Sequence, residues 1–215
     1  MAEIEAIVCD FGGVLTTPLI GSFMAFQDQT GISTENLGKA MAAVAEERGE
    51  NPLYELERGE IAETEFLEHL AGGLEPLLGH RPHLHRFKEI YFEALEPNPA
   101  MIELMRELKG SGYRMAMLTN NVREWEPLWR SMLPVDEIFE LVVDSGFVGH
   151  RKPEARIYEL TLERIGLPAE TCLFVDDFLH NCEGARQAGM TAVHFQTNDQ
   201  AIPEIRATLS PQPPN

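Results

Sequence analysis

Short apolar runs alternate along the chain with longer stretches in which apolar residues recur at helical spacing. The apolar runs are typical of buried strands and cover residues 4–9, 113–118, 139–143, 172–175 and 191–195. The stretches between the last four runs predict amphipathic helices. Because strands that alternate with helices of this length indicate βαβ units, we predict an α/β fold with a parallel, Rossmann-like sheet.

Proline and glycine mark the ends of the predicted helices. Asn98 followed by Pro99 predicts the start of the first helix of this alternating region. Pro153 predicts the start of a later helix, and Gly166 predicts its end, because proline suits the first turn of a helix and glycine suits the position after the last.

Residues 17–96 interrupt the alternation, because they contain no strand-like run. Helical spacing occurs there instead, most clearly over residues 84–95. Glycine and proline residues divide the segment into several short helices. We therefore predict a helical cap at 17–96, inserted into a core of residues 1–16 and 97–210, with a flexible tail at 211–215.

Residues with chemical functions follow several of the predicted strands. Asp10 follows the first strand, Thr119 the second and the pair Asp176–Asp177 the fourth, while Lys152 precedes a predicted helix. Since residues just beyond the carboxyl ends of parallel strands gather in one crevice, we expect these side chains to meet. A nucleophile, an acidic pair and donors to phosphate oxygens suit phosphoryl transfer.

Structural roles are the alternative for each of these residues. Asp10 suits a turn at the end of its strand, and Asp176 or Asp177 suits the cap of the helix that follows. Against these roles, the glycine pair Gly12–Gly13 lets backbone N–H groups approach an anion. Two adjacent carboxylates also repel each other, and a divalent cation would relieve that repulsion. The functional interpretation is therefore preferred.

Four segments hold these residues in order: IVCDFGGV, MLTNN, GHRKPE and LFVDDF. In content and spacing they resemble the haloacid dehalogenase superfamily of hydrolases. The resemblance covers nearly the whole chain. It is strongest to the branch with a helical cap inserted after the first motif, which includes the N-terminal phosphatase domain of soluble epoxide hydrolase. It implies that Asp10 is a nucleophile that forms an aspartyl-phosphate, and that Lys152 neutralises the phosphate and the carboxylates.

The resemblance also implies a magnesium site and a phosphate site. Mg²⁺ would contact Asp10, the backbone carbonyl of Gly12 and Asp177, with Asp176 acting directly or through water. The phosphate group would be bound by Phe11, Gly12, Thr119, Asn120 and Lys152. The implied substrate is a small phosphorylated metabolite.

One position departs from the family pattern. Phosphatases of the superfamily usually carry a second Asp two residues after the nucleophile, as general acid and base, and here that position is Gly12. Since such a group contributes typically about 10²–10⁴ in rate, we expect low activity. A 2-haloacid dehalogenase, whose leaving halide needs no proton, and a non-catalytic phosphate-binding or regulatory protein are the alternatives. Superfamily dehalogenases lack the acidic pair, so Asp176–Asp177 argues against the first.

Charge and cysteine content narrow the range of partners and locations. The chain has 17 basic and 35 acidic residues and a net charge of −18, which disfavours nucleic-acid binding because that relies on Lys and Arg. No apolar run approaches the length of a membrane span, and the N-terminus lacks a secretory signal. Cys9, Cys172 and Cys182 have no metal-ligand spacing and fit free thiols, so we predict a cytoplasmic protein.

Overall fold

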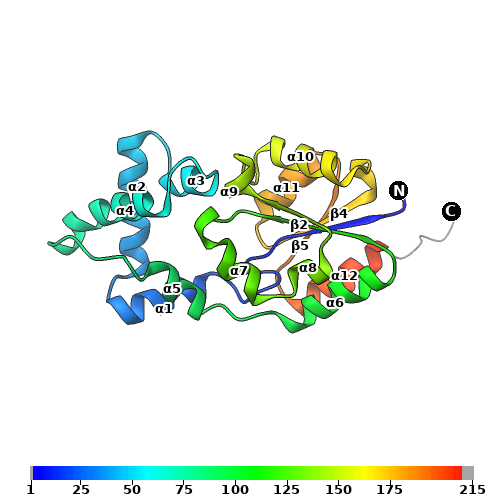
Figure 1. The fold of residues 1–215 in the computed structure, drawn as a ribbon, viewed down its shortest axis with the longest axis horizontal. Coiled ribbons are helices and arrows are strands. Elements are labelled where there is room, and N and C mark those ends of the chain that lie inside the picture. Colours follow the sequence, from blue (N-terminus) through cyan, green and yellow to red (C-terminus); the bar gives the residue numbers. More distant parts are fainter. Residues whose placement is uncertain (1, 210–215) are drawn as a thin grey trace.

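The computed structural model describes residues 2–209, and its centre is a five-stranded sheet (Figure 1). The strands are β1 (Ala6–Cys9), β2 (Arg114–Thr119), β3 (Leu141–Asp144), β4 (Cys172–Asp176) and β5 (Thr191–His194). Their order in space is β3-β2-β1-β4-β5, and every pairing is parallel. The predicted Rossmann-like α/β fold is therefore confirmed. The predicted tail at 211–215 lies outside the described residues.

Alternate residues of the central strand β1 face opposite sides of the sheet. Ile7 and Cys9 belong to one apolar cluster, Ala6 and Val8 belong to another, and all four are fully buried. Because side chains alternate along a strand, a strand that is covered on both faces needs apolar residues at every position. This explains the uninterrupted apolar run that precedes Asp10.

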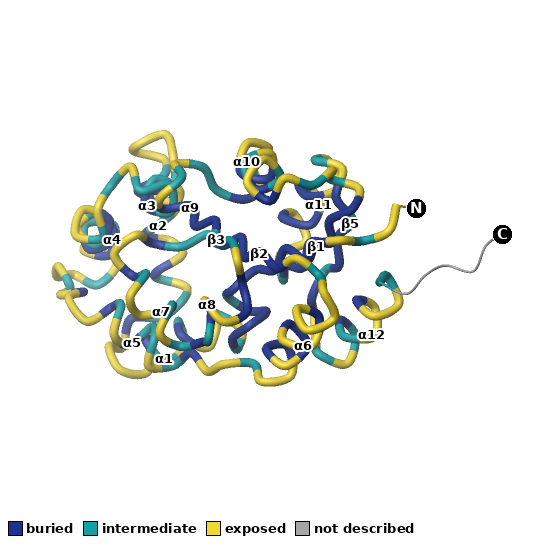
Figure 2. Tube along the Cα trace, turned by 45° about the vertical axis from the view of Figure 1, so that its right-hand side comes forward, coloured by how far each residue is buried: buried dark blue, intermediate teal, exposed yellow. Residues whose placement is uncertain are grey.

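Helices cover both faces of the sheet. On the face of Ala6 and Val8 lie α10 (Ala155–Ile165) and α11 (Leu179–Gln187). On the other face lie α6 (Pro99–Gly110) and α12 (Asn198–Leu209). Three short helices lie between β2 and α10 in the sequence: α7 (Glu126–Met132), α8 (Val135–Ile138) and α9 (Ser145–Val148). Figure 2 shows that the strands are buried while the helices expose their outer sides.

Five helices occupy the chain between β1 and α6. They are α1 (Ile20–Thr30), α2 (Thr34–Arg48), α3 (Pro52–Glu57), α4 (Glu63–Leu78) and α5 (Phe87–Glu93). They lie together to one side of the sheet (Figure 1), and the segments that connect them to it pair at Thr16 and Pro97. The predicted helical character of this segment is confirmed. Among residues 2–209, no helix is long and apolar enough to cross a membrane.

The start of α10 differs from the sequence prediction. The prediction that Pro153 begins this helix is wrong, because α10 begins at Ala155 with Glu154 as its N-cap. The reason lies one residue earlier, where the side chain of Asn120 holds the backbone of Lys152. The Lys152 N–H donates to Asn120 Oδ1 at 2.8 Å, and Asn120 Nδ2 donates to the Lys152 carbonyl at 3.0 Å. The helix therefore begins only after this anchored turn.

Candidate active site

The predicted catalytic and metal-binding side chains meet at the carboxyl ends of the strands. Asp10 directly follows β1, Thr119 ends β2 and Asp176 ends β4. Lys152 comes from the loop before α10, and its Nζ lies 2.8 Å from Asp10 Oδ1 and 2.6 Å from Asp176 Oδ2. Asp10, Asp176 and Asp177 each offer one oxygen, and these atoms lie within 4.8 Å of one another. The sheet thus gathers residues that are far apart in the sequence.

Lys152 is buried between two carboxylates. Its side chain is 1% exposed, and its Nζ also donates to the carbonyl of Leu118 at 2.9 Å. Burial alone would lower the pKa of Lys152, but the charges of Asp10 and Asp176 raise this pKa above its ordinary value. Lys152 is therefore a fixed positive charge and differs from the solvated lysine that is usual in a loop.

Asp176 is fully buried, and both of its oxygens have hydrogen-bond donors. Besides Lys152, the N–H of Phe178 donates to Oδ1 at 2.8 Å, and Asn181 Nδ2 donates to Oδ1 at 2.9 Å. Asn181 belongs to the site and was missed by the sequence analysis. Its only signal is an amide in the first turn of the helix after the acidic pair. Asp176 thus holds Lys152 in position, and a cation at Asp176 would compete with these donors.

Asp177, in contrast, has an oxygen without a donor. Its Oδ1 is buried and has no hydrogen-bond partner among the described residues. Oδ2 lies so close to Gly13 that a Cβ at that glycine would be only 2.2 Å away, and Gly13 has a φ of 76°. Both observations require glycine at this position. Burial and the charge of Asp176 raise the pKa of Asp177 to about 6.

The cluster carries more negative than positive charge. One ammonium, that of Lys152, faces the three carboxylates of Asp10, Asp176 and Asp177. Burial raises the pKa of Asp10 well above its ordinary value; Lys152 opposes this shift, whereas Asp176 and Asp177 add to it. A divalent cation would balance the excess charge, and Mg²⁺ prefers oxygen ligands. Together with the free oxygen of Asp177, this shows that the donor set fits Mg²⁺.

The residues expected to bind phosphate line one cavity beside Asp10, with a volume of about 640 Å³. Phe11 donates its backbone N–H to Asp10 Oδ1 at 2.7 Å and so orients the carboxylate. Thr119 is buried at the wall of the cavity, and Gly12 also borders it. The side chain of Asn120 is engaged with the backbone of Lys152. Asn120 therefore positions the lysine in this structure.

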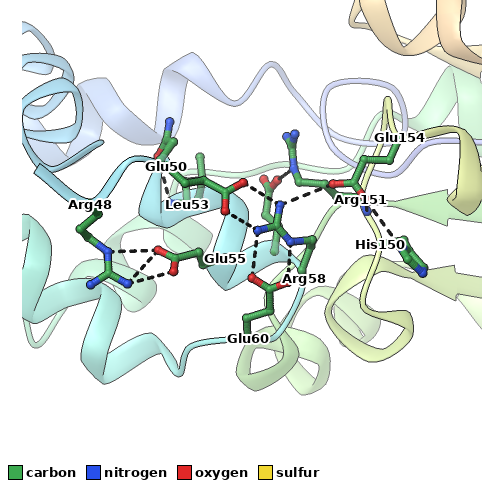
Figure 3. Close-up of polar contacts among 11 residues, drawn as sticks. Arg48, Glu50, Leu53, Glu55, Arg58, Glu60, His150, Arg151 and Glu154 are labelled. Atoms are coloured by element: carbon green, nitrogen blue, oxygen red, sulfur yellow. Dashed lines mark hydrogen bonds and ion pairs between the residues drawn. The ribbon is translucent and has the colours of Figure 1, made fainter. Parts of the chain in front are cut away.

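Helix α3 is attached to the loop that carries Lys152. Arg151 Nε donates to Glu57 at 2.6 Å, and the Arg151 guanidinium lies 3.9 Å from the centre of the Tyr54 ring. Arg58 reaches Glu154 of the same loop at 3.5 Å, within a wider network of charged groups (Figure 3). No local sequence pattern signals this role of Arg151, because its partner Glu57 lies 94 positions away. These contacts join one wall of the cavity to the sheet.

Replacing Lys152 with Met should lower the free energy of unfolding by about 3–5 kcal/mol, because it leaves two buried carboxylates without their cation. Urea denaturation at neutral pH, with a chelator present, measures this loss. Lys39, which is exposed and pairs with Glu35 at 2.6 Å, provides the matched control. Lys39→Met should change the stability by no more than about 0.5 kcal/mol.

A double variant separates the charge effect from the loss of packing. Adding Asp176→Asn to Lys152→Met removes one of the orphaned charges, so it should restore part of the lost stability. A double variant that is less stable than Lys152→Met alone would contradict the view that Lys152 acts by compensating these carboxylates.

Comparison with known proteins agrees with this geometry. A family model described as a haloacid dehalogenase-like hydrolase matches residues 4–189. The chain therefore belongs to the haloacid dehalogenase-like hydrolases, and the superfamily predicted from the sequence is confirmed.

Two relatives and one solved structure illustrate the similarity. A sesquiterpene phosphatase of Aspergillus oryzae is 29% identical over 211 residues, which cover 94% of this chain and 95% of that protein. A glyceraldehyde 3-phosphate phosphatase of Methanothermobacter thermautotrophicus is 30% identical over 165 residues, covering 75% and 69%. A HAD family enzyme of Bacteroides thetaiotaomicron, in complex with magnesium and inorganic phosphate, shares the fold with a TM-score of 0.69 at 20% identity, covering 90% and 94%.

Proposed function

We propose that this hydrolase is a Mg²⁺-dependent phosphatase that acts on a small phosphorylated metabolite through an aspartyl-phosphate at Asp10. The observation that carries the proposal is the position of Asp10, which borders the cavity, lies 2.8 Å from the ammonium of Lys152 and clusters with Asp177. Carboxylates serve as nucleophiles in phosphoryl transfer, because the covalent intermediate divides one difficult step into two. The phosphatase names of the two relatives support the proposal.

In the proposed reaction, Lys152 neutralises charge on the phosphate group as Asp10 attacks the phosphorus. Thr119 would donate its hydroxyl to a phosphate oxygen, and the backbone N–H of Gly12 would provide another donor. The backbone N–H of Phe11, which donates to Asp10 Oδ1 in this structure, would turn to the phosphate once Asp10 attacks. Asn120 would act chiefly by fixing Lys152, as its two hydrogen bonds to that residue suggest. The buried positions of Thr119 and Lys152 make these donors rigid before the substrate binds.

The proposed Mg²⁺ site uses Asp10, the carbonyl of Gly12 and Asp177, and Asp176 supports it through Lys152 and neighbouring waters. Bound Mg²⁺ would supply positive charge that offsets the carboxylates and the phosphate oxygens. Asp177 is the strongest candidate ligand, because its Oδ1 is buried without a donor.

The missing acid–base residue determines which phosphate esters we expect to be hydrolysed fastest. Because Gly12 has no side chain, the proton for the leaving alcohol must come from water or from the substrate itself. Leaving groups that are stable as anions, such as aryl oxides, hardly need that proton. We therefore expect aryl phosphates to be hydrolysed far better than alkyl phosphates of similar size.

We also propose that residues 17–96 act as a cap on a core formed by 1–16 and 97–210. The ion pair between Arg151 and Glu57 and the contact between Arg151 and Tyr54 hold α3 against the core. With α3 in this position, side chains of the cap complete the cavity beside Asp10. The cap would exclude water from the site and select the organic part of the substrate.

Two assays with the purified protein test the reaction class. Hydrolysis of 4-nitrophenyl phosphate that requires Mg²⁺ and stops with a chelator is the expected result. Hydrolysis of 2-chloropropionate in the presence of chelator, without any action on phosphate esters, would instead establish a dehalogenase. Binding of phosphate without turnover of either substrate would support the alternative of a non-catalytic phosphate-binding protein.

Replacing Asp177 with Asn should weaken Mg²⁺ binding at least about tenfold, because it removes a charged oxygen ligand. Calorimetry at neutral pH measures the affinity, with Asp199→Asn at an exposed position as the matched control. Since burial raises the pKa of Asp177 to about 6, protons should compete with the cation below that pH, and wild-type affinity should fall as the pH decreases. Equal affinity of the wild type and Asp177→Asn would refute the site.

A further inference from the structure

The cavity beside Asp10 is apolar over most of its wall. Aliphatic and aromatic side chains of α1, α2, α4 and α5 line it together with Asp10 and Lys152. Tyr91 lies at the centre of the aromatic part, with its ring 5.7 Å from that of Phe23 and 5.2 Å from that of Trp125. Burial and the nearby charges of Glu57 and Asp10 raise the pKa of Tyr91, so its phenol stays neutral. The apolar wall therefore begins next to the nucleophile.

Several polar side chains that border this cavity already have partners within the protein. Arg151 and Glu57 pair with each other at 2.6 Å. Asn121 Oδ1 accepts the N–H of Val122 at 2.9 Å, and Trp125 Nε1 donates outward to Glu63 at 2.9 Å. These side chains offer few free partners to a polyhydroxylated substrate, and a buried hydroxyl without a partner is costly.

The rim of the cavity is apolar as well. Ile20 of α1 and Phe178 of the loop after β4 both line the cavity and are 59% and 45% exposed. Exposure of such large apolar side chains to water is unfavourable, and contact with an apolar ligand would remove that cost. Apolar surface therefore extends from the interior of the cavity to its opening.

We propose that the substrate of this site is the phosphate monoester of a long hydrocarbon alcohol, whose tail lies along the apolar wall while its phosphate meets Asp10 and Lys152. This inference rests on the proposed phosphatase function and names its substrate class. A cavity of about 640 Å³ has room for roughly twenty non-hydrogen atoms, at about 30 Å³ each. Such a ligand would fill the space that a three-carbon phosphate, with about ten non-hydrogen atoms, leaves about half empty.

The reaction on such an ester balances with water alone. Asp10 forms a bond to phosphorus as the P–O bond to the alcohol breaks, and the departing oxygen takes a proton from water. The hydroxide that remains releases the phosphoryl group from Asp10. The products are the free alcohol and inorganic phosphate.

The first test measures kcat/KM for n-alkyl phosphates of increasing chain length, below their micelle concentrations, together with glycerol 3-phosphate and glucose 6-phosphate. For the alkyl esters, kcat/KM should rise about fourfold per added methylene until the cavity is filled. Higher kcat/KM for the two polyol phosphates than for the long alkyl esters would overturn the inference and leave the phosphatase function intact.

The second test is independent of turnover, because it uses n-alkyl phosphonates, which are not hydrolysed. Their dissociation constants, measured by calorimetry with Mg²⁺ present, should fall with chain length by a similar factor. Dissociation constants that do not depend on chain length would overturn the inference. If chain-length-dependent binding occurs but no ester is hydrolysed, including 4-nitrophenyl phosphate, the substrate class stands as a ligand class and the phosphatase proposal fails.

A substitution that places a larger side chain in the cavity tests where the alkyl tail of the substrate lies. Gly38 of α2 lines the cavity, and a Cβ at this position would meet no atom within 4 Å. Gly38→Leu should lower kcat/KM for a dodecyl ester about fifteenfold, the loss of roughly two buried methylenes, and should affect 4-nitrophenyl phosphate hydrolysis far less. Gly110→Leu is the matched control, since a Cβ at Gly110 would also meet no atom within 4 Å. Gly110 lies in α6 and does not line the cavity. Equal effects of the two substitutions would contradict the proposed tail position.

Discussion

Asp10→Asn should lower kcat for the hydrolysis of 4-nitrophenyl phosphate by on the order of 10⁴–10⁶, the scale of losing a covalent nucleophile. The amide is nearly the same size as the carboxylate but is a far poorer nucleophile. It also lacks the charge that pairs with Lys152 at 2.8 Å. Steady-state kinetics with saturating Mg²⁺ measure the loss.

The same variant should fold at least as well as the wild type. Burial and the neighbouring carboxylates raise the pKa of Asp10, so a neutral side chain relieves repulsion at neutral pH. Thermal unfolding checks this, and Asp28→Asn at an exposed position serves as the matched control for both assays. A well-folded Asp10→Asn protein with near wild-type kcat would exclude Asp10 as the nucleophile.

Gly12→Asp should raise kcat for alkyl phosphates by up to about 10²–10⁴, the contribution of a positioned general acid and base. Aryl phosphates should gain much less at the step in which the leaving group departs. The structure permits the substitution, because Gly12 is absent from the glycines with positive φ among the described residues. A Cβ there would lie 3.1 Å from the end of the flexible Leu19 side chain, which must shift slightly.

The control for this variant is Gly12→Asn, which has the same bulk but cannot transfer the proton. It should displace Leu19 to the same extent and give no gain on alkyl phosphates. Equal rates for the Asp and Asn variants, with unchanged melting temperatures, would mean that the proton comes from another group or that phosphate esters are not the native substrates.

Much of the core was predictable from local patterns. Apolar runs identified all five strands, because strands buried on both faces need apolar residues throughout. The meeting of Asp10 with Asp176 followed from one topological rule, that the carboxyl ends of parallel strands share a crevice. Lys152 lies in the loop before α10, and its place beside these carboxylates followed from the family resemblance. Free cysteines were also predicted correctly, since all three are unpaired and buried. The cytoplasmic location and the lack of a nucleic-acid partner stay predictions.

The features that sequence reasoning missed depend on contacts between distant segments. The ion pair of Glu57 with Arg151 joins α3 to the loop before α10 across 94 positions, and no local period signals such a pair. Helix α10 begins after Pro153, and not at it as predicted, because Asn120 from the end of another strand anchors Lys152. The different roles of Asp176, which holds Lys152, and Asp177, which keeps an oxygen without a donor, could be seen only from their hydrogen bonds.

The most direct test of the central claim is a rapid-quench experiment in which Mg²⁺-loaded protein reacts with an excess of 4-nitrophenyl phosphate. Because Gly12 supplies no base for the attacking water, the second step should be slow and the aspartyl-phosphate should accumulate. The account predicts a burst of nitrophenol equal to the enzyme concentration and a phosphoryl group on the peptide that contains Asp10, as detected by mass spectrometry after acid quench. Turnover without a burst, with that peptide unmodified, would contradict the account.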